Sequence, residues 1–203
     1  MATKKSSARP DELEVISFAT RAAWSRWLAA HHASSRGIWL QLARKGTGKK
    51  SITYPQAVEV ALCFGWIDGQ GKSKDVTWWL VKFTPRRQRS IWSKLNRKRA
   101  LALIAAGAMK PAGMAEIERA KRDGRWQAAY DSPKRSALPK DLEQALARNA
   151  RAHSFFADLD ARNRYAILFR VQTAKKAETR ARRIAEFVRM LARRETLYPR
   201  RVT

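Results

Sequence analysis

Acidic residues are scarce in this chain of 203 residues. It has 17 aspartates and glutamates against 43 lysines and arginines, so its formal net charge at pH 7 is +26. An excess of this size makes the folded chain repel itself, and too few acids remain to neutralise the basic surface from within. The composition therefore predicts an anionic partner, either an anionic ligand or a polyanion such as nucleic acid, anionic lipid or an acidic envelope polymer.

Cysteines and long apolar stretches are also scarce. Cys63 is the only cysteine, which excludes an intrachain disulfide and fits a reducing compartment. No apolar run approaches the roughly 20 residues that a membrane-spanning helix needs. The N-terminal sequence MATKKSSARPDELEV lacks the apolar core of a secretory signal. We therefore expect a cytoplasmic protein with no transmembrane segment.

The familiar motifs of catalysis and cofactor binding are missing as well. His31 and His32 are adjacent and so point to different helix faces, and neither they nor His153 has zinc-site spacing to Cys63. No nucleophile elbow, phosphate-cradling glycine loop or dinucleotide fingerprint occurs. We expect no metal and no cofactor, and a non-enzymatic role is favoured over an enzyme.

What the chain does contain is a mixed pattern of helices and strands up to about residue 130, after a polar tail over residues 1–12 that we expect to be disordered. We predict an α+β domain over residues 13–130, with a small antiparallel sheet packed by helices. Period-2 alternation predicts two strands, and helical spacing predicts helices after Thr20 and Pro55. The strands are expected at residues 38–43 and 78–83, with a short extended piece at 66–68 before a turn at Gly69 and Gly71.

Beyond a polar stretch at residues 127–138, the pattern is helical throughout. We predict a helical C-terminal segment over residues 138–198. Its helices are expected at residues 140–149, 151–159, 161–173 and 176–194. The last two resemble a helix-turn-helix in outline, but a basic helical hairpin is favoured, because arginines spread around a helix do not specify base contacts.

Residues 65–93 combine tryptophans, turn residues and cations around an isolated acid, Asp68. Hydroxyls and backbone N–H groups at a helix start, beside two arginines, suit an anion. The alternatives are that the tryptophans are core and that Ser90 or Ser93 is a helix cap. The predicted ligand-binding or anion-binding residues are Trp66, Asp68, Gln70, Thr84, Arg86, Arg87, Ser90, Trp92 and Ser93.

Asp68 is the one weak catalytic candidate, as a general base. A simpler interpretation is that it accepts hydrogen bonds from turn amides or pairs with an arginine. We hypothesise that Asp68 and Arg86 meet at one pocket.

Basic residues on two predicted helices are candidates for nucleic-acid contacts, because arginine forks bind phosphate oxygens. The alternative is a solvated face whose arginine stems cover apolar surface. These candidates are Arg97, Lys98, Arg99, Arg180 and Arg183.

Several strings resemble the YdeI/OmpD-associated family of bacterial proteins: GIWLQLARKG, TYPQAVEVALCFGWIDGQ, the stretch that begins FTPRRQRSIWSKLNRKRA, and NRYAILFRVQTAKKAETRARRIAEFVRMLA. The resemblance spans about residues 18–199. It implies a link to bacteriocin or antimicrobial-peptide protection and to an outer-membrane porin, and it supplies no catalytic residues.

These observations together predict a cytoplasmic, non-enzymatic stress or bacteriocin-protection protein of the YdeI type with a basic anion-binding surface. The alternatives are a nucleic-acid-binding or regulatory protein and an enzyme that acts on an anionic small molecule. A protein partner is also compatible with the sequence. Direct capture of cationic peptides is disfavoured, because a chain with a net charge of +26 would repel them.

Overall fold

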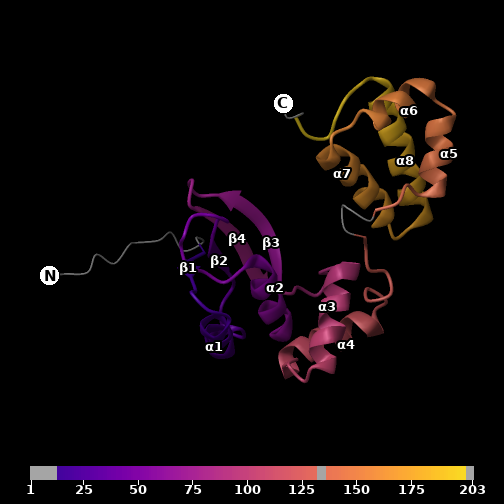
Figure 1. Ribbon diagram of the computed structural model, residues 1–203. Helices are drawn as coiled ribbons and strands as arrows, with labels where there is room; N and C mark the ends of the chain where they lie inside the picture. Colours follow the sequence, from indigo (N-terminus) through magenta and orange to yellow (C-terminus); the bar gives the residue numbers. More distant parts are fainter. Residues whose placement is uncertain (1–12, 132–135, 200–203) are drawn as a thin grey trace. The chain divides into compact units, whose positions relative to one another are not determined.

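The computed structural model describes residues 13–131 and 136–199. The chain divides into two compact units, each with its own elements (Figure 1). The first unit contains the residues up to Ile91 together with Asn96–Gln127. The second unit contains Trp92–Leu95 and the residues from Ala128 onward.

A four-stranded sheet organises the first unit. Its strands lie in the order β1-β2-β4-β3, where β4 pairs antiparallel with both β2 and β3, and β1 pairs parallel with β2. The bounds are β1 (Val15–Ser17), β2 (Ile38–Ala43), β3 (Trp66–Ser73) and β4 (Trp78–Pro85). The predicted α+β class is confirmed. The prediction of an antiparallel sheet is wrong at β1, a strand of three residues that is too short to show an alternation.

Strand β3 continues through the glycines that the sequence assigned to a turn. The pairing with β4 shifts register between Asp68 and Gly71, so the extra residues are accommodated in a bulge rather than a reversal of the chain. The reversal comes later, at Asp75. Its side chain accepts hydrogen bonds from the backbone N–H groups of Thr77 and Trp78, both at 2.8 Å.

One face of the sheet carries the core of the first unit. On β2 the buried residues Ile38, Leu40 and Leu42 alternate with half-buried ones, as expected for a sheet covered on one side. Helix α1 (Arg21–His31) contributes the fully buried Trp24, whose indole N–H donates to the Ala57 carbonyl at 3.1 Å. Aromatic contacts link Trp24 to the rings of Trp66 and Phe83 at centroid distances of 6.3 and 5.9 Å.

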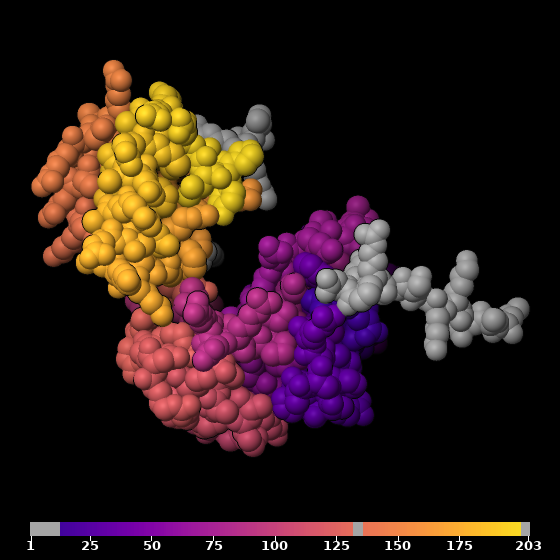
Figure 2. Space-filling model, turned by 180° about the vertical axis from the view of Figure 1, so that it is seen from behind, coloured from indigo at the N-terminus to yellow at the C-terminus, as the bar shows by residue number. Residues whose placement is uncertain are grey.

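Helix α2 (Tyr54–Cys63) begins at a capping box, in which Thr53 and Gln56 satisfy each other's backbone N–H groups. Helices α3 (Lys94–Ala105) and α4 (Pro111–Arg122) follow the sheet. Figure 2 shows the α3–α4 segment and the strands of the first unit as one continuous body from behind. Helix α4 approaches the end of α2 so closely that a Cβ added at Gly113 would lie 2.5 Å from the Leu62 carbonyl oxygen.

The second unit has a helical core. It is built by α5 (Lys140–Ala147), α6 (Ala150–Ala157), α7 (Ala161–Gln172) and α8 (Ala177–Ala192). The predicted helix positions agree with these to within a few residues. The buried residues of its apolar cluster all lie between Leu142 and Leu191, and these four helices supply every one of them except Leu159, which lies between α6 and α7. Asn163, which is fully buried, accepts from the Tyr198 N–H at 2.9 Å and donates to its carbonyl at 3.1 Å, which fixes the chain after α8 against α7.

Among the described residues, no helix combines the length and the apolar character needed to cross a bilayer.

Candidate anion-binding site

Both tryptophans of the predicted ligand site are core residues. Trp66 is 1% exposed and its indole N–H donates to the His32 carbonyl at 3.1 Å. Trp92 is also 1% exposed and lies in the second unit. Neither ring can stack on a ligand unless the core opens.

Asp68 has a different partner from the one we hypothesised. Its carboxylate accepts a hydrogen bond from the Tyr54 hydroxyl at 2.6 Å. Asp68 lies opposite Phe83 in the β3–β4 register, so it faces the helix-covered side of the sheet, where α2 begins. The structure pairs Asp68 with Tyr54 and not with Arg86.

Arg86 is a buried residue of the first unit and lies near other charged side chains. It is 5% exposed, and its guanidinium donates to the Ile91 carbonyl at 3.3 Å. Arg86, Arg119 and Arg125 all favour the ionised form of Glu116, but burial outweighs them and raises the pKa of that carboxyl. Arg125, 4% exposed, donates to the Ser90 carbonyl at 2.5 Å. Arg86 and Arg125 thereby hold residues 86–91 in place.

The remaining predicted ligand residues do not converge on Asp68. Ser90 accepts from the Arg87 N–H at 2.9 Å and so closes a turn. Gln70 and Arg87 are exposed, whereas Thr84 is half-buried. Ser93 forms a β-bridge with Tyr130 in the second unit.

Four of the five nucleic-acid candidates make intramolecular contacts. Arg97 donates to the Trp126 carbonyl at 3.0 Å, and Arg99 donates to the Asn96 side chain at 3.1 Å. Arg180 binds Asp141 through two nitrogens, at 2.6 and 2.9 Å, and Arg183 donates to the Arg170 carbonyl at 2.5 Å. Lys98 is exposed.

A cavity of about 610 Å³ opens instead where β2 leads into α2. Three cations, two glycines and two aromatic rings contribute to it, and none of its lining residues is acidic. The lining residues are Leu42, Ala43, Arg44, Lys45, Gly46, Gly48, Lys49, Ser51, Ile52, Thr53, Tyr54 and Trp79.

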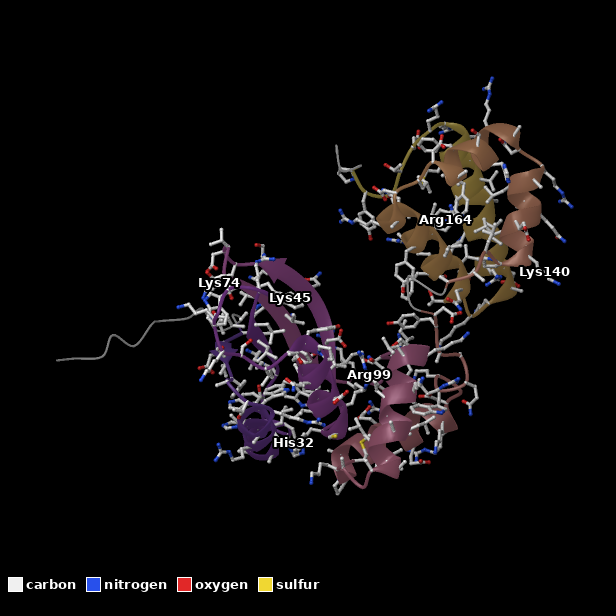
Figure 3. The ribbon with its side chains drawn as sticks, in the orientation of Figure 1. His32, Lys45, Lys74, Arg99, Lys140 and Arg164 are labelled. Carbon is white, nitrogen blue, oxygen red and sulfur yellow. The ribbon has the colours of Figure 1, made fainter. Side chains whose placement is uncertain are left out.

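Lys45 and Lys49 project from the loop without a salt-bridge or hydrogen-bond partner in the described part of the chain. Figure 3 labels Lys45, at the end of the sheet where β2 stops. The loop turns at Gly46 and Gly48, whose φ angles of +84° and +68° are left-handed and favour glycine. Both ammonium groups are therefore available to an incoming anion.

The walls of this cavity are held in place by the fold. The Arg44 guanidinium donates to the Ser73 hydroxyl at 2.7 Å and to the Asp75 carbonyl at 3.1 Å, which ties the loop to the β3–β4 hairpin. The rings of Tyr54 and Trp79 lie 5.7 Å apart. Since the Tyr54 hydroxyl donates to Asp68, the carboxylate orients the phenol at the cavity wall.

Part of this site can be recognised from the local sequence. The loop's glycines and lysines stand together at residues 45–50, a cluster that is typical of a loop. The aromatic wall could not be predicted, because Tyr54 and Trp79 come from separate elements that meet only in the folded sheet and helix.

Chemically, this arrangement suits the binding of an anion rather than catalysis. Two unpaired ammonium groups attract an anion, and the aromatic pair offers a flat apolar wall beside them. No group of three His, Cys, Asp or Glu side chains in the described ranges is placed to hold a metal ion.

Two family models match the chain in succession. Residues 16–116 match a domain of unknown function (DUF8412), and residues 136–194 match the family described as bacteriocin-protection, YdeI or OmpD-associated. The C-terminal segment belongs to the YdeI/OmpD-associated family. The strings of the first unit that resembled that family fall under the other model. No similar curated protein and no similar solved structure was found.

The YdeI/OmpD-associated segment has an aromatic groove of its own, of about 600 Å³, along α7. The guanidinium of Arg162 lies 4.2 Å from the centroid of the Tyr198 ring. Burial raises the pKa of Tyr165 to about 12, with Tyr130 and Asp131 adding to the effect, so this phenol stays protonated at neutral pH. The candidate anion site lies outside this segment, in the part matched by the other model.

Proposed function

We propose that this chain is a non-enzymatic, anion-binding protein of the YdeI/OmpD-associated type, and that the anion binds in the cavity between β2 and α2. The observation that carries the proposal is the pair of unpartnered ammonium groups of Lys45 and Lys49 over a cavity with no acidic lining residue. With a net charge of +26, the protein surrounds this cavity with a potential that draws anions toward it.

The ligand class is a phosphate or carboxylate attached to a flat group. The lysines would take the charged end, and the wall formed by Tyr54 and Trp79 would pack against the flat part. If the chain has a protective role, its direct ligand is better explained as an anion than as a cationic peptide, because the positive potential would repel a cationic peptide. The proposal places the protein in the cytoplasm, in keeping with its single buried cysteine.

The test is thermal stabilisation of the full chain by inorganic phosphate, pyrophosphate and a nucleoside monophosphate in a constant high-salt background. A site-bound anion at a concentration of 100 times its Kd stabilises the folded state by about 2.7 kcal/mol. Lys45→Ala/Lys49→Ala should abolish most of the shift in melting temperature.

The matched control is Lys175→Ala/Lys176→Ala, which removes the same charge from exposed positions before α8. The control should retain the full shift. Equal shifts for the two variants would show that the anions act on the overall charge, and the proposed site would then be abandoned.

A further inference from the structure

The face of the sheet opposite the helices carries a second set of residues suited to an anionic partner. Directly opposed residues in a β-pair share a face. The register pairs Trp39 with Lys82, Gln41 with Leu80, and Ala43 with Trp78. All of these residues are half-buried except Leu80, which is buried. The same face receives Lys72, which pairs with Leu80 across β3–β4.

Two tryptophans on this face are half-buried rather than buried. The Lys72 ammonium lies over the Trp39 ring, 4.3 Å from its centroid. The Trp78 ring has no aromatic or cationic partner, and its indole N–H has no acceptor, among residues 13–131 and 136–199. A flat π-surface without a partner, next to cations, is the usual platform for stacking an unpaired base.

Positive charge dominates this face, and Asp75 at the hairpin turn is engaged with the backbone, where it accepts from the Trp78 N–H at 2.8 Å. Lys74 reaches across it to the Gln41 side chain at 2.5 Å, and Figure 3 shows Lys74 at the same end of the sheet as Lys45. No aspartate or glutamate occurs among the described residues whose side chains the register places here. These residues are Val15, Ser17, Trp39, Gln41, Ala43, Ile67, Lys72, Trp78, Leu80, Lys82 and Thr84.

We propose that this open face binds single-stranded nucleic acid, with Trp78 stacking on a base and with Lys72, Lys74 and Lys82 contacting phosphates. A duplex offers no exposed base face to a flat sheet, so the tryptophan favours the single strand. This surface lies across the sheet from the cavity between β2 and α2, and Trp78, Lys72, Lys74 and Lys82 are not among the residues that line that cavity.

The proposal is tested by the fluorescence anisotropy of labelled oligothymidylate and oligouridylate titrated with the full-length protein. Trp78→Ala should weaken binding about tenfold, since stacking on one aromatic ring typically contributes 1–3 kcal/mol. Trp78→Phe keeps a ring and should lose much less. Similar affinities for the two oligomers mean that the protein recognises bases and phosphates. A higher affinity for oligouridylate would mean that it also contacts the 2′-hydroxyl.

Salt dependence tests the lysines separately. Three phosphate contacts on a single strand give a slope of log K against log salt of about −2. Lys72→Gln/Lys74→Gln/Lys82→Gln should flatten the slope by about that amount. The control Lys140→Gln/Lys175→Gln/Lys176→Gln removes equal charge from exposed positions of the second unit and should change it far less.

Several results would overturn the inference. One is equal affinity of the wild type and Trp78→Ala, with both folded by circular dichroism. Another is equal binding of duplex and single strand that does not depend on Trp78, which would mean a non-specific polyanion surface. If Trp78→Ala fails to fold, the comparison of the two lysine variants decides. Lys45→Ala/Lys49→Ala should bind the oligomers nearly as wild type, so the two proposals can fail independently.

Discussion

Several arginines in this chain donate to backbone carbonyls. Arg97, Arg125 and Arg183 each donate to the main-chain oxygen of a residue distant in sequence. A guanidinium has five N–H groups and accepts nothing, so in a chain with few acids many of its donors turn to carbonyl oxygens. This explains why several arginines that the sequence marked as nucleic-acid candidates are engaged within the fold, whereas the cations that we propose to bind ligands at both sites are lysines with no acidic partner among the described residues.

One of the arginines with an acidic partner, Arg180, gives a pH-dependent prediction. The hydrogen bond from Arg180 lowers the pKa of Asp141 from its usual 3.8, and the same contact raises the pKa of Arg180. A carboxyl whose folded-state pKa is lowered stabilises the fold above its unfolded pKa, and loses that effect as the pH falls through the folded value. Because both partners are partly exposed, we expect Asp141→Asn to cost only about 0.5–1 kcal/mol at pH 7. The cost should shrink below about pH 4.

Urea unfolding followed by circular dichroism at several pH values measures this difference. Glu143→Gln is the control, because it removes one negative charge from the same first turn of α5 without touching Arg180. If both variants show the same cost and the same pH profile, the effect belongs to the helix end and not to the ion pair.

At the scale of elements, the sequence predicted what local periodicity determines. The strand at 38–43 and the C-terminal helices follow from the spacing of apolar residues, and the structure has them within a few residues. Strand β1 and the second half of β3 exist because β2 and β4 lie beside them, and glycines alone suggest a turn there. The partner of Asp68 could not be predicted for the same reason, since Tyr54 meets Asp68 and Trp79 only after the helix packs on the sheet.

The contact between α2 and α4 yields a prediction about stability, in which the direction of the change tests how closely the two helices pack. In an exposed helix, Gly→Ala stabilises by about 1 kcal/mol. At Gly113 the new methyl group would lie 2.5 Å from both the Leu62 carbonyl oxygen and the Met109 sulfur, so α4 must move away from α2. We expect Gly113→Ala to destabilise the protein by roughly 1–3 kcal/mol, in line with overpacked cores.

The measurement is the denaturant midpoint, together with near-ultraviolet circular dichroism as a probe of the tryptophan core. Ala115→Gly, at an exposed position of the same helix, calibrates the helix propensity and should cost about 1 kcal/mol. A stabilising Gly113→Ala would mean that the two helices do not approach this closely.

At the scale of the whole molecule, the charge and the fold are separate properties. The net charge of +26 predicts an anionic partner but says nothing about where it binds. The positions come from the fold, which in the described part of the chain leaves lysines without acidic partners at the end of the sheet and on its open face, whereas Arg86 and Arg125 are buried. A sequence rich in cations therefore needs its tertiary contacts before any cation can be assigned to a ligand.

The two-unit organisation leads to a prediction about independent folding. The apolar cluster of the second unit draws all its buried residues from Leu142 to Leu191, and the matched family segment spans residues 136–194. A fragment of residues 136–199, which includes the Asn163–Tyr198 contacts, should therefore be helical and unfold cooperatively, although with modest stability at this size. Leu146→Ala, at a fully buried position, should cost about 2–5 kcal/mol and remove the transition from the fragment. Circular dichroism during heating measures both, and a non-cooperative melt of the unsubstituted fragment would mean that the family segment depends on the rest of the chain to fold.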